Sequence, residues 1–582
     1  MTSLEDKRHT LAHLLAQAAL EHYPNARLTL GPAIDNGFYY DIDFGAEKIS
    51  DADLPKLEAT MRKHLPQWED FSSEEVTAEE ALARFSGSQG ANPYKAELVR
   101  EIAARGEKIT LYMSGGFTDL CRGGHSENPA KDIAPDSFAL DRVAGAYWRG
   151  DEKNPMLTRI YGLAFDTKEE LDAYRTQMEE AKKRDHRKLG MELKLFTISS
   201  LIGAGLPLLQ PKGAIIRREI EEYLWELHKG LDYSRVYTPH IAKEHLYETS
   251  GHAEKFGDEL FRVSGKEEKF ILKPMNCPHH MQIFADNQFS YRDMPVRYFE
   301  PATVYRDEKT GQLAGLTRVR SITQDDGHLF CRPSQIGEEV AKIVNVIKAF
   351  YGTMDMLEGY WVRLSLRGPE GKYLGSDEVW EKAEEALRAA ADENDLPYKV
   401  GIDEAAFYGP KLDFIFKDAI GREWQLATIQ CDFNLPERFD LSYTNEEGAS
   451  ERPVVIHRAI SGSLERFMGV AIEHFAGAFP LWLSPVQVRV LPVSEKQASY
   501  AKEVADTLKA VGIRAEADDA NESLGKKIRA GKMEKIPYLL VVGDAEIEAK
   551  TVSVESRDAG KLDAMAVEDF VQRATEEIRV RA

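Results

Sequence analysis

Cysteine is scarce in this sequence. There are four among 582 residues, too few for a disulfide scaffold, and we interpret them as reduced thiols: Cys121, Cys277, Cys331 and Cys431. Long apolar runs are also lacking, since one of the longest, residues 475–483, is far shorter than the roughly 20 residues that span a bilayer. The charged N-terminus has no apolar core of a secretory signal. These absences predict a cytoplasmic protein with no membrane partner.

An excess of positive charge is absent as well. Lys and Arg number 75 against 97 Asp and Glu, and the net charge of -22 argues against binding a nucleic acid through bulk positive charge. Basic runs remain at residues 182–188 and 526–535, where each is either a local contact patch or a solvated helix face. The composition is that of a globular protein, and the length suggests about three or four domains.

The hydrophobic pattern divides the chain into sections. Residues 1–165 open with apolar residues at helical spacing and continue with short strand-like runs and glycine turns. A charged helical connector, residues 166–189, precedes a large section of mixed pattern, residues 190–484. In residues 485–582 strands and helices alternate, which predicts a small α/β domain around a mostly parallel sheet.

The large section lacks a P-loop, a zincin motif and a dinucleotide fingerprint, so any nucleotide there must bind to another architecture. Two strand-like runs joined by a polar turn occupy residues 296–331. In the second run, side chains of one parity would share a face: Arg318, Arg320, Gln324, Asp326 and His328. These groups predict a face that grips phosphate and a small polar ligand, although a merely solvated polar face would show the same pattern.

Residues 454–467 predict a strand, a Gly-Ser turn and a helix. Arg466 then falls in the first turns of that helix, where it could meet an anion attracted by the helix N-terminus. By itself this pattern is common in αβ proteins.

Two pairs of metal-ligand side chains occur in the first section. His9 and His13 are four residues apart on the predicted first helix, and Cys121 and His125 repeat that spacing. Converging pairs would suit tetrahedral zinc, or would form a metal-free polar pocket that positions water for hydrolysis. Partly exposed helix histidines are the plainer alternative.

Three elements stand in the order that class II aminoacyl-tRNA synthetases have. They are a helix and strand ending in Tyr-Thr-Pro239, the hairpin at Arg306-Asp-Glu308, and Gly-Ser-Leu-Glu-Arg466. Companion segments around Cys277, His328, Tyr408 to Lys411 and His457 make the chain resemble the threonyl-tRNA synthetase family specifically. The resemblance covers nearly the whole chain. It implies an α+β multidomain fold: an editing domain (1–165), a connecting helix (166–189), a class II antiparallel-sheet catalytic domain (190–484) and a C-terminal α/β anticodon-binding domain (485–582).

The resemblance implies ATP-dependent attachment of L-threonine to tRNA(Thr) through a threonyl-adenylate. One zinc ion would be held in the amino-acid pocket by Cys277, His328 and His457. Threonine's amine and hydroxyl could both bind that zinc, whereas valine has no hydroxyl. Serine keeps the hydroxyl and loses only a methyl, worth about 1–3 kcal/mol, so a second site that hydrolyses seryl-tRNA(Thr) is needed. The residues that match this editing site are His9, His13, Asp119, Cys121 and His125.

Other residues carry further roles by resemblance. ATP, with Mg²⁺, would be bound by Arg306, Glu308, Arg318 and Arg466. The threonine and adenylate pocket would be lined by Gln324, Asp326, Tyr408, Lys411, Gln430 and Ser463, with His252 a weaker candidate near the transfer step. The resemblance also implies a homodimer.

The sequence departs from the family in two places. The chain begins almost directly at the editing helix, so we expect it to lack the ubiquitin-like domain of many bacterial members. Asn521 and Glu546 match anticodon contacts, but Glu555 stands where the family usually has a basic residue, with Arg557 nearby. Two alternatives are a non-catalytic paralogue that binds tRNA or threonine, and a ligase for serine or proline. The intact motifs disfavour the paralogue, the Cys/His/His set disfavours proline, and the editing segment disfavours serine.

Overall fold

The computed structural model describes residues 2–85, 92–369 and 371–581, and the chain forms two compact units, Met1–Glu179 and Glu180–Ala582. We call them the N-terminal unit and the C-terminal unit. Among the described residues no helix is both long and apolar enough to cross a membrane.

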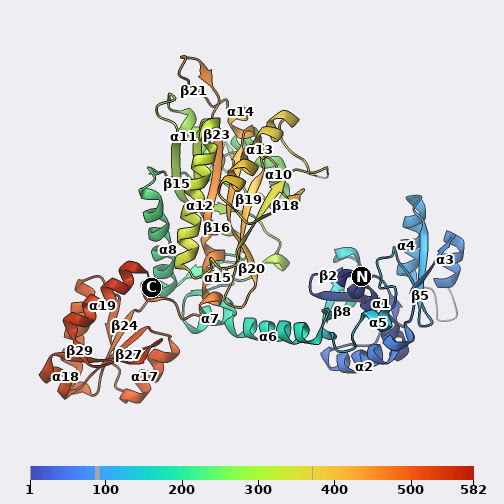
Figure 1. Ribbon diagram of the computed structural model, residues 1–582, viewed down its shortest axis with the longest axis horizontal. Coiled ribbons are helices and arrows are strands. Elements are labelled where there is room, and N and C mark those ends of the chain that lie inside the picture. Colours follow the sequence, from blue (N-terminus) through green and yellow to red (C-terminus); the bar gives the residue numbers. More distant parts are fainter. Residues whose placement is uncertain (1, 86–91, 370, 582) are drawn as a thin grey trace. The chain divides into compact units, whose positions relative to one another are not determined.

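The N-terminal unit is built around helix α1, Leu4–His22, and a five-stranded sheet (Figure 1). Ser3 begins the helix with a capping box, in which its hydroxyl accepts a hydrogen bond from Asp6 N at 3.1 Å. The leucines of α1 pack against Phe38, Tyr40 and Ile160 of the sheet. The sheet has the order β1-β3-β8-β7, with β2 beside β3; its strands are Arg27–Leu28, Ala33–Ile34, Gly37–Asp43, Phe138–Tyr147 and Met156–Ala164.

A second, smaller sheet completes this unit. It has the order β4-β5-β6, with strands Ser72–Val76, Ile109–Ser114 and Phe117–Leu120. Helices α3 and α4, Ala78–Phe85 and Pro93–Ala104, pack on it, and α2, Leu54–His64, packs on α1. The predicted connector forms two helices, α6 (Lys168–Arg184) and α7 (His186–Glu192), because Asp185 interrupts the run and caps α7 at Arg187 N, 2.8 Å away.

An eight-stranded, largely antiparallel sheet forms the centre of the C-terminal unit (Figure 1). Its order is β11-β15-β16-β23-β20-β19-β17-β18, and only the two edge pairings are parallel among the described strands. The strands, in chain order, are Ser234–Arg235, Val296–Tyr305, Ser321–Cys331, Trp361–Leu366, Tyr398–Ile402, Lys411–Lys417, Glu423–Asp432 and Val454–Ser463.

Helices cover one face of this sheet and leave the other for the site. Leu329 and Cys331 of β16 belong to the core with helices α8 (Pro211–Lys229), α12 (Ile336–Thr353), α13 (Asp377–Glu393) and α15 (Leu464–His474). Because side chains alternate along a strand, His328 and Phe330 face the opposite side. There Phe330 stacks on Phe284 of α11, Cys277–Ala285, with ring centroids 4.3 Å apart.

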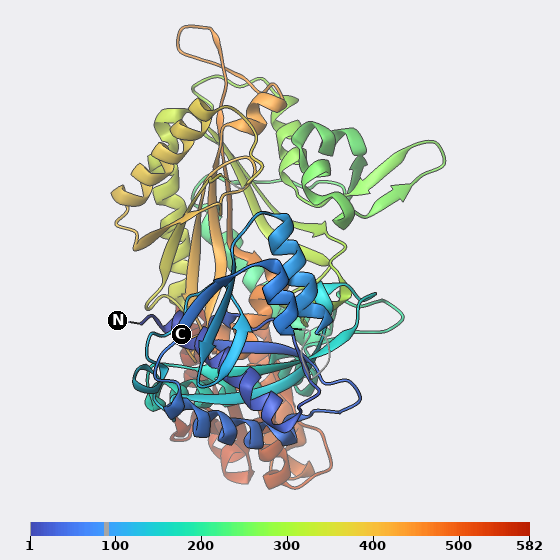
Figure 2. The ribbon, with the colours of Figure 1, turned by 90° about the vertical axis from the view of Figure 1, so that its right-hand side faces the viewer.

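A small group of elements stands beside this sheet (green in Figure 2). It comprises helices α9 (Glu244–Ser250) and α10 (His252–Phe256) and a three-stranded sheet of β12 (Ile241–Lys243), β13 (Arg262–Ser264) and β14 (Lys269–Leu272). Its own core is small and includes Tyr247, Leu260 and Ile271.

The C-terminal residues alternate strands and helices, as the sequence predicts. The sheet order is β25-β24-β26-β27-β28, with β29 beside β27; the strands are Val488–Pro492, Ala515–Ala517, Tyr538–Val542, Thr551–Ser556, Gly560–Lys561 and Met565–Ala566. The first three pair in parallel, but β27 joins β26 antiparallel, so the sheet is mixed rather than mostly parallel. Its helices are α16 (Ala498–Ala510), α17 (Leu524–Met533), α18 (Asp544–Ala549) and α19 (Val567–Val580).

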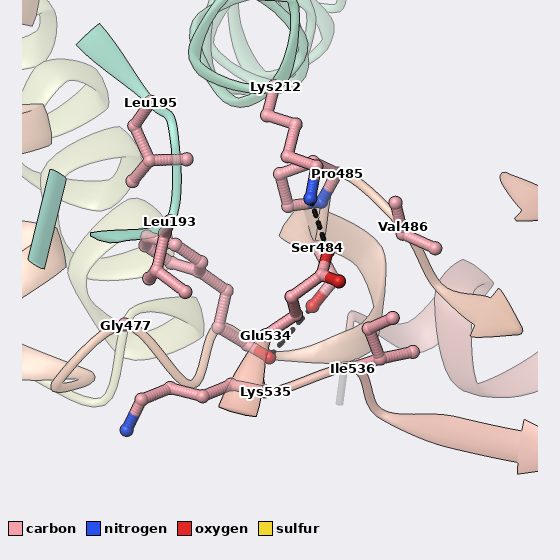
Figure 3. A pocket seen from close by; sticks show the side chains of 11 residues that line it. Leu193, Leu195, Lys212, Gly477, Ser484, Pro485, Val486, Glu534, Lys535 and Ile536 are labelled. Atoms are coloured by element: carbon pink, nitrogen blue, oxygen red, sulfur yellow. Dashed lines mark hydrogen bonds and ion pairs between the residues drawn. The ribbon is translucent and has the colours of Figure 1, made fainter. Parts of the chain in front are cut away.

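Ion pairs join this alternating segment to helix α8. Lys212 Nζ lies 2.6 Å from Glu534, and Arg514 lies 3.0 Å from Glu219. Figure 3 shows Lys212 and Glu534 meeting beside a cavity of about 20 Å³. That volume admits a single water, so this joint is a packing contact and not a ligand site.

Two predicted details were wrong at their edges. Strand β16 begins at Ser321, so Arg318 and Arg320 lie in the preceding turn and do not share its face. The expected Gly-Ser turn is absent from the described residues 454–467, because β23 runs to Ser463 and α15 begins at Leu464. Gly462 has φ +74° there, and a Cβ on it would lie 2.6 Å from Leu426 O, so the position requires glycine.

Candidate functional site

Three metal-ligand side chains converge on the open face of the large sheet. His328 on β16 and His457 on β23 are directly paired across the two strands, and Cys277 is the first residue of α11. His328 Nε2 lies 3.0 Å from His457 Nδ1, and all three ligand atoms lie within 4.8 Å of one another. All three side chains are buried. The sheet topology thus brings together residues that are far apart in the sequence.

The hydrogen bonds around these rings test whether they fit a metal. Asp432, which can only accept, lies 2.8 Å from His457 Nε2, so that nitrogen donates and Nδ1 keeps its lone pair. His328 Nδ1 is held at 2.8 Å by His280, and its Nε2 faces His457. Burial, with Asp326 and Asp432 nearby, raises the pKa of the Cys277 thiol well above its usual range, and a cation would reverse that. One sulfur and two imidazoles with an open side have the composition of a zinc site that keeps one position free.

A cavity of about 270 Å³ opens beside these three residues. Five of the residues that line it were singled out from the sequence: His252, Arg306, Tyr408, Lys411 and Gln430. Met275 and residues 404–407 are also part of the lining. Tyr408 stacks on the His457 ring, with centroids 4.9 Å apart, and its hydroxyl donates to Gln430 Oε1. His252 Nε2 lies 3.5 Å from Cys277 Sγ. The cavity and the metal-ligand cluster therefore form one site.

Several buried polar atoms of the predicted site residues are free to meet a ligand. Asp326 Oδ2, Arg306 Nε and Arg466 Nε have no hydrogen-bond partner in the described part of the chain. Leaving such atoms unsatisfied costs about 1–3 kcal/mol each, more when they are charged, so their presence points to a polar ligand. The guanidinium of Arg306 lies 4.8 Å from the Phe256 ring centroid, which fixes its position.

The other predicted residues of the large sheet lie on or next to β15, β16 and β23, and the lining of this cavity does not include them. Glu308 forms an ion pair with Arg318 at 2.7 Å, and Arg320 donates to the Glu308 backbone oxygen, so these arginines hold the hairpin instead of facing the cavity from the strand. Gln324 pairs with Ser463 across β16 and β23, and the Ser463 hydroxyl caps α15 at Arg466 N. The sequence reasoning missed Asp432, His280 and Glu300. Strand parity could have predicted Asp432, because it lies two residues after Gln430 on β20 and therefore faces the same side of the sheet.

The N-terminal unit contains a second cluster, formed by His9, His13, Cys121 and His125. Cys121 Sγ lies 3.3 Å from His9 Nε2 and 3.4 Å from His125 Nε2. Between Cys121 and His125 the chain turns back at Gly123 and Gly124, whose φ values of +105° and +81° favour glycine. The two pairs predicted from their spacing do converge.

A buried charge network supports this cluster. Asp119 Oδ2 lies 3.0 Å from His13 Nδ1 and accepts from the Tyr40 hydroxyl, and its Oδ1 lies 2.5 Å from Lys95 Nζ. The cluster borders a cavity of about 360 Å³, which is also lined by Tyr39, Leu98 and Arg105. The sequence reasoning named Asp119 but missed Lys95, which no motif marks.

In this network, nearby charges and hydrogen bonds shift the pKa values of the buried groups more strongly than burial does. Burial would raise the pKa of Asp119, but Lys95 and His13 hold it well below its usual range. Burial would likewise raise the pKa of Cys121, but hydrogen bonds from His125, His13 and His9 lower it to about 3. Burial would lower the pKa of His13, yet Asp119 and Cys121 raise it to about 9. Between about pH 3 and pH 9 the Cys121 thiolate therefore lies beside the His13 imidazolium, which is a reactive arrangement.

We expect Cys121 to react with iodoacetamide at similar rates at pH 5 and pH 8, because a pKa of about 3 keeps it ionised throughout. An ordinary thiol, with a pKa of about 8.5, gains roughly 10³-fold in thiolate over that interval. The other cysteines are fully buried, so mass-spectrometric mapping would follow Cys121. A rate that rises about 10³-fold would contradict the assigned ionisation.

Comparison with known proteins agrees with this geometry. The family described as tRNA synthetase class II core domain (G, H, P, S and T) matches residues 261–475, and the anticodon binding domain family matches residues 487–577. Together with the antiparallel sheet these matches define a class II aminoacyl-tRNA synthetase. Threonine–tRNA ligases of Thermus thermophilus and Porphyromonas gingivalis are 50% and 49% identical to the chain, over 99% and 98% of its length and 88% and 87% of theirs. The chain belongs to the threonine–tRNA ligase family, and the family resemblance predicted from the sequence is confirmed.

Solved structures give the same result. The RNA binding domain of threonyl-tRNA synthetase from Cryptosporidium parvum is 37% identical, with a TM-score of 0.65, and the match covers 68% of this chain and 98% of that one. A putative threonyl-tRNA synthetase from Aeropyrum pernix is 30% identical, with a TM-score of 0.60, over 69% of this chain and 96% of that one. The predicted α+β multidomain fold is thus confirmed.

Proposed function

We propose that this protein attaches L-threonine to tRNA(Thr) with ATP, through a threonyl-adenylate. The observation that carries the proposal is the convergence of Cys277, His328 and His457 beside the cavity of Arg306 and Tyr408. We assign one zinc ion to the three ligands. When bound, zinc would supply a Lewis acid for the amine and hydroxyl of threonine. Asp326 Oδ2, which is buried, accepts no hydrogen bond in the described chain and lies 3.8 Å from His328 Nδ1, would accept from the substrate amino group.

The ATP end of the site consists of arginines with unpaired nitrogens. Arg306 and Arg466 would neutralise the phosphates, with Mg²⁺ arriving on the nucleotide, while Glu308 and Arg318 shape the hairpin beside them. Attack of the threonine carboxylate on the α-phosphate needs chiefly positioning and charge stabilisation. Gln324, Lys411, Gln430 and Ser463 complete the lining that we assign to the threonyl-adenylate.

The test of this function is amino-acid-dependent ATP–pyrophosphate exchange, measured with threonine, serine and valine before and after zinc chelation. Strong exchange with threonine, weak exchange with serine and none with valine, all lost on chelation, would support it. No exchange with any of them in folded, zinc-loaded protein would leave a binding paralogue.

Replacing Arg306 with alanine should lower kcat/KM for ATP in this exchange by about 10² to 10³, the usual cost of removing one donor aimed at developing charge. The variant should still bind zinc, because Arg306 is not among the three ligands. Arg292→Ala, which removes an exposed arginine of the same unit, is the matched control and should exchange normally. A loss below tenfold for Arg306→Ala would remove Arg306 from the ATP site.

We further propose that the N-terminal cluster hydrolyses seryl-tRNA(Thr). The observation behind it is a cavity bordered by His9, His13 and Cys121, with Asp119 held ionised by Lys95. His125 Nδ1 has no hydrogen-bond partner among the described residues, so it is free to position water or substrate. The four donor side chains also suit a metal ion. The zinc content distinguishes a metal-free cluster from a metal-bound one. If only the catalytic site binds zinc, the protein contains one ion per chain, and if this cluster binds zinc as well, it contains two.

The C-terminal segment would bind the anticodon of tRNA(Thr). Glu546 accepts from Ser553, and Glu555 pairs with Lys532 at 2.5 Å beside a cavity of about 310 Å³ that Arg557 also lines. Lys532 places a positive charge close to Glu555, the position where the family usually has a basic residue. Asn521 lies in a bend, exposed, before α17. We assign residues 1–165 to editing, 166–189 to the connector, 190–484 to catalysis and 485–582 to anticodon binding.

We also propose a cytoplasmic homodimer. Leu201 and Tyr237 are large apolar side chains exposed by 95% and 78%, and Ile202 is also exposed. A second copy of the chain would cover them. Light scattering would then give twice the chain mass of 65.6 kDa.

A further inference from the structure

We propose that His280 and Glu300 are positioning residues that fix the ring tautomer of His328 through a chain of hydrogen bonds and thereby aim its free nitrogen at the zinc position. His280 lies three residues after Cys277 on α11, and Glu300 lies on β15. His328 Nδ1 is 2.8 Å from His280 Nδ1, and His280 Nε2 is 3.0 Å from Glu300 Oε2. This inference rests on the zinc site of the proposed function.

The direction of the hydrogen bonds follows from the carboxylate. Glu300 accepts hydrogen bonds from the backbone N–H of Thr238 and from the side-chain amide of Asn276, and we infer that it accepts from His280 as well. His280 Nε2 also lies 3.0 Å from Asn276 Nδ2, but that amide donates to the same Glu300 oxygen, so the hydrogen of His280 Nε2 points at Glu300 and His280 Nδ1 presents a lone pair. His328 must donate from Nδ1 to that lone pair, which leaves His328 Nε2 unprotonated and aimed at His457. Without the Glu300 carboxylate, His280 could instead donate from Nδ1 to His328 Nδ1. His328 would then carry its hydrogen on Nε2, the nitrogen that must bind the metal.

Asp432 does the same for His457 by a direct contact of 2.8 Å, so two separate carboxylates direct two lone pairs at one point. Two bare nitrogens 3.0 Å apart repel each other unless a cation lies between them. Such outer partners typically change metal affinity by about 10- to 100-fold.

Glu300 is itself fixed by a buried network. Its Oε1 accepts from Thr238 N at 2.9 Å, and its Oε2 accepts from Asn276 Nδ2 at 2.9 Å. Lys273 Nζ lies 3.7 Å from Glu300 and donates to Thr238 Oγ1 at 2.7 Å, which balances the carboxylate charge. Glu300 and Lys273 are almost fully buried. The relay thus connects the Thr-Pro segment after β11 to a metal ligand, with each polar group paired.

The test is zinc affinity of the full chain, measured by competition with a chromophoric chelator, together with the absorption spectrum of the cobalt-substituted protein. His280→Leu should weaken zinc binding by about 10- to 100-fold and shift the cobalt bands. His280→Gln should recover most of the affinity, because a glutamine amide offers an acceptor at one end and a donor at the other.

His279→Leu is the matched control. His279 is the neighbouring buried histidine of α11, but it bonds to Tyr247 at 2.9 Å, away from the ligands, so its loss should leave zinc affinity unchanged. Equal affinity and identical cobalt spectra in His280→Leu and the unaltered protein would overturn the inference alone. Absence of tight zinc binding in the unaltered protein would overturn the zinc site of the proposed function and this inference with it.

Discussion

Replacing Cys277 with alanine is expected to remove zinc from the catalytic site and to lower threonine-dependent pyrophosphate exchange by about 10³-fold or more. Two imidazoles remain, and the loss of the thiolate removes one of only three protein ligands, so the set that holds zinc is incomplete. Metal coordination of the substrate is worth several kcal/mol, and each 1.4 kcal/mol is about tenfold in rate. Zinc content by atomic emission and exchange kinetics measure the two effects.

Cys331→Ala separates this loss from a packing defect. Cys331 is as fully buried as Cys277, but it lies on the helix-covered face of β16, among core residues. It should lose some stability and keep both zinc and exchange. If Cys277→Ala retained one zinc per chain and normal exchange, the three-ligand assignment would fail.

Replacing both His9 and His13 with alanine should let seryl-tRNA(Thr) accumulate while threonine activation stays intact. His13 is bonded to Asp119 and His9 to Cys121, so the double change removes two imidazoles from the cavity. Loss of such acid–base groups typically costs about 10² to 10⁴ in rate. Deacylation of serine-charged tRNA(Thr), together with pyrophosphate exchange, measures the two activities in one preparation.

His22→Ala offers a matched control on the same helix. His22 is bonded to Thr60 at 2.7 Å and does not line the cavity, so its loss should leave deacylation unchanged. Low levels of seryl-tRNA(Thr) in the double variant would refute the editing assignment. A parallel loss of threonine activation would instead show that the change disturbs more than this cluster.

Local patterns anticipated much of the fold. Helical spacing in residues 8–23 corresponds to α1, and the strand and helix alternation after residue 485 corresponds to β24 through α19. The parity argument holds for Gln324, Asp326 and His328, because they pair with alternate residues of β15 in an unbroken register. The same argument failed for Arg318 and Arg320, because strand periodicity applies only where the backbone is extended and the strand starts at Ser321.

The clusters differ in how far local reasoning reached them. His9 with His13, and Cys121 with His125, are each visible as a four-residue spacing, so convergence was a reasonable hypothesis. Cys277, His328 and His457 show no such spacing, and family resemblance alone identified them as metal ligands, although strand parity had already singled out His328. Lys95, His280 and Glu300 were missed, because a buried polar residue on a helix or strand looks like any other until its partners are known.

By itself, the sequence determined the family, the residue types of both clusters and the periodicity of the main elements, because these depend on neighbours along the chain. The tertiary structure alone decided what those residues meet. The pairing of β16 with β23 sets His328 opposite His457, and the packing of α11 on that sheet brings Cys277 and His280 beside them. The tautomer that we infer for each imidazole also depends on the tertiary structure. The carboxylates of Glu300 and Asp432 lie on other strands, and only folding brings them within hydrogen-bond distance.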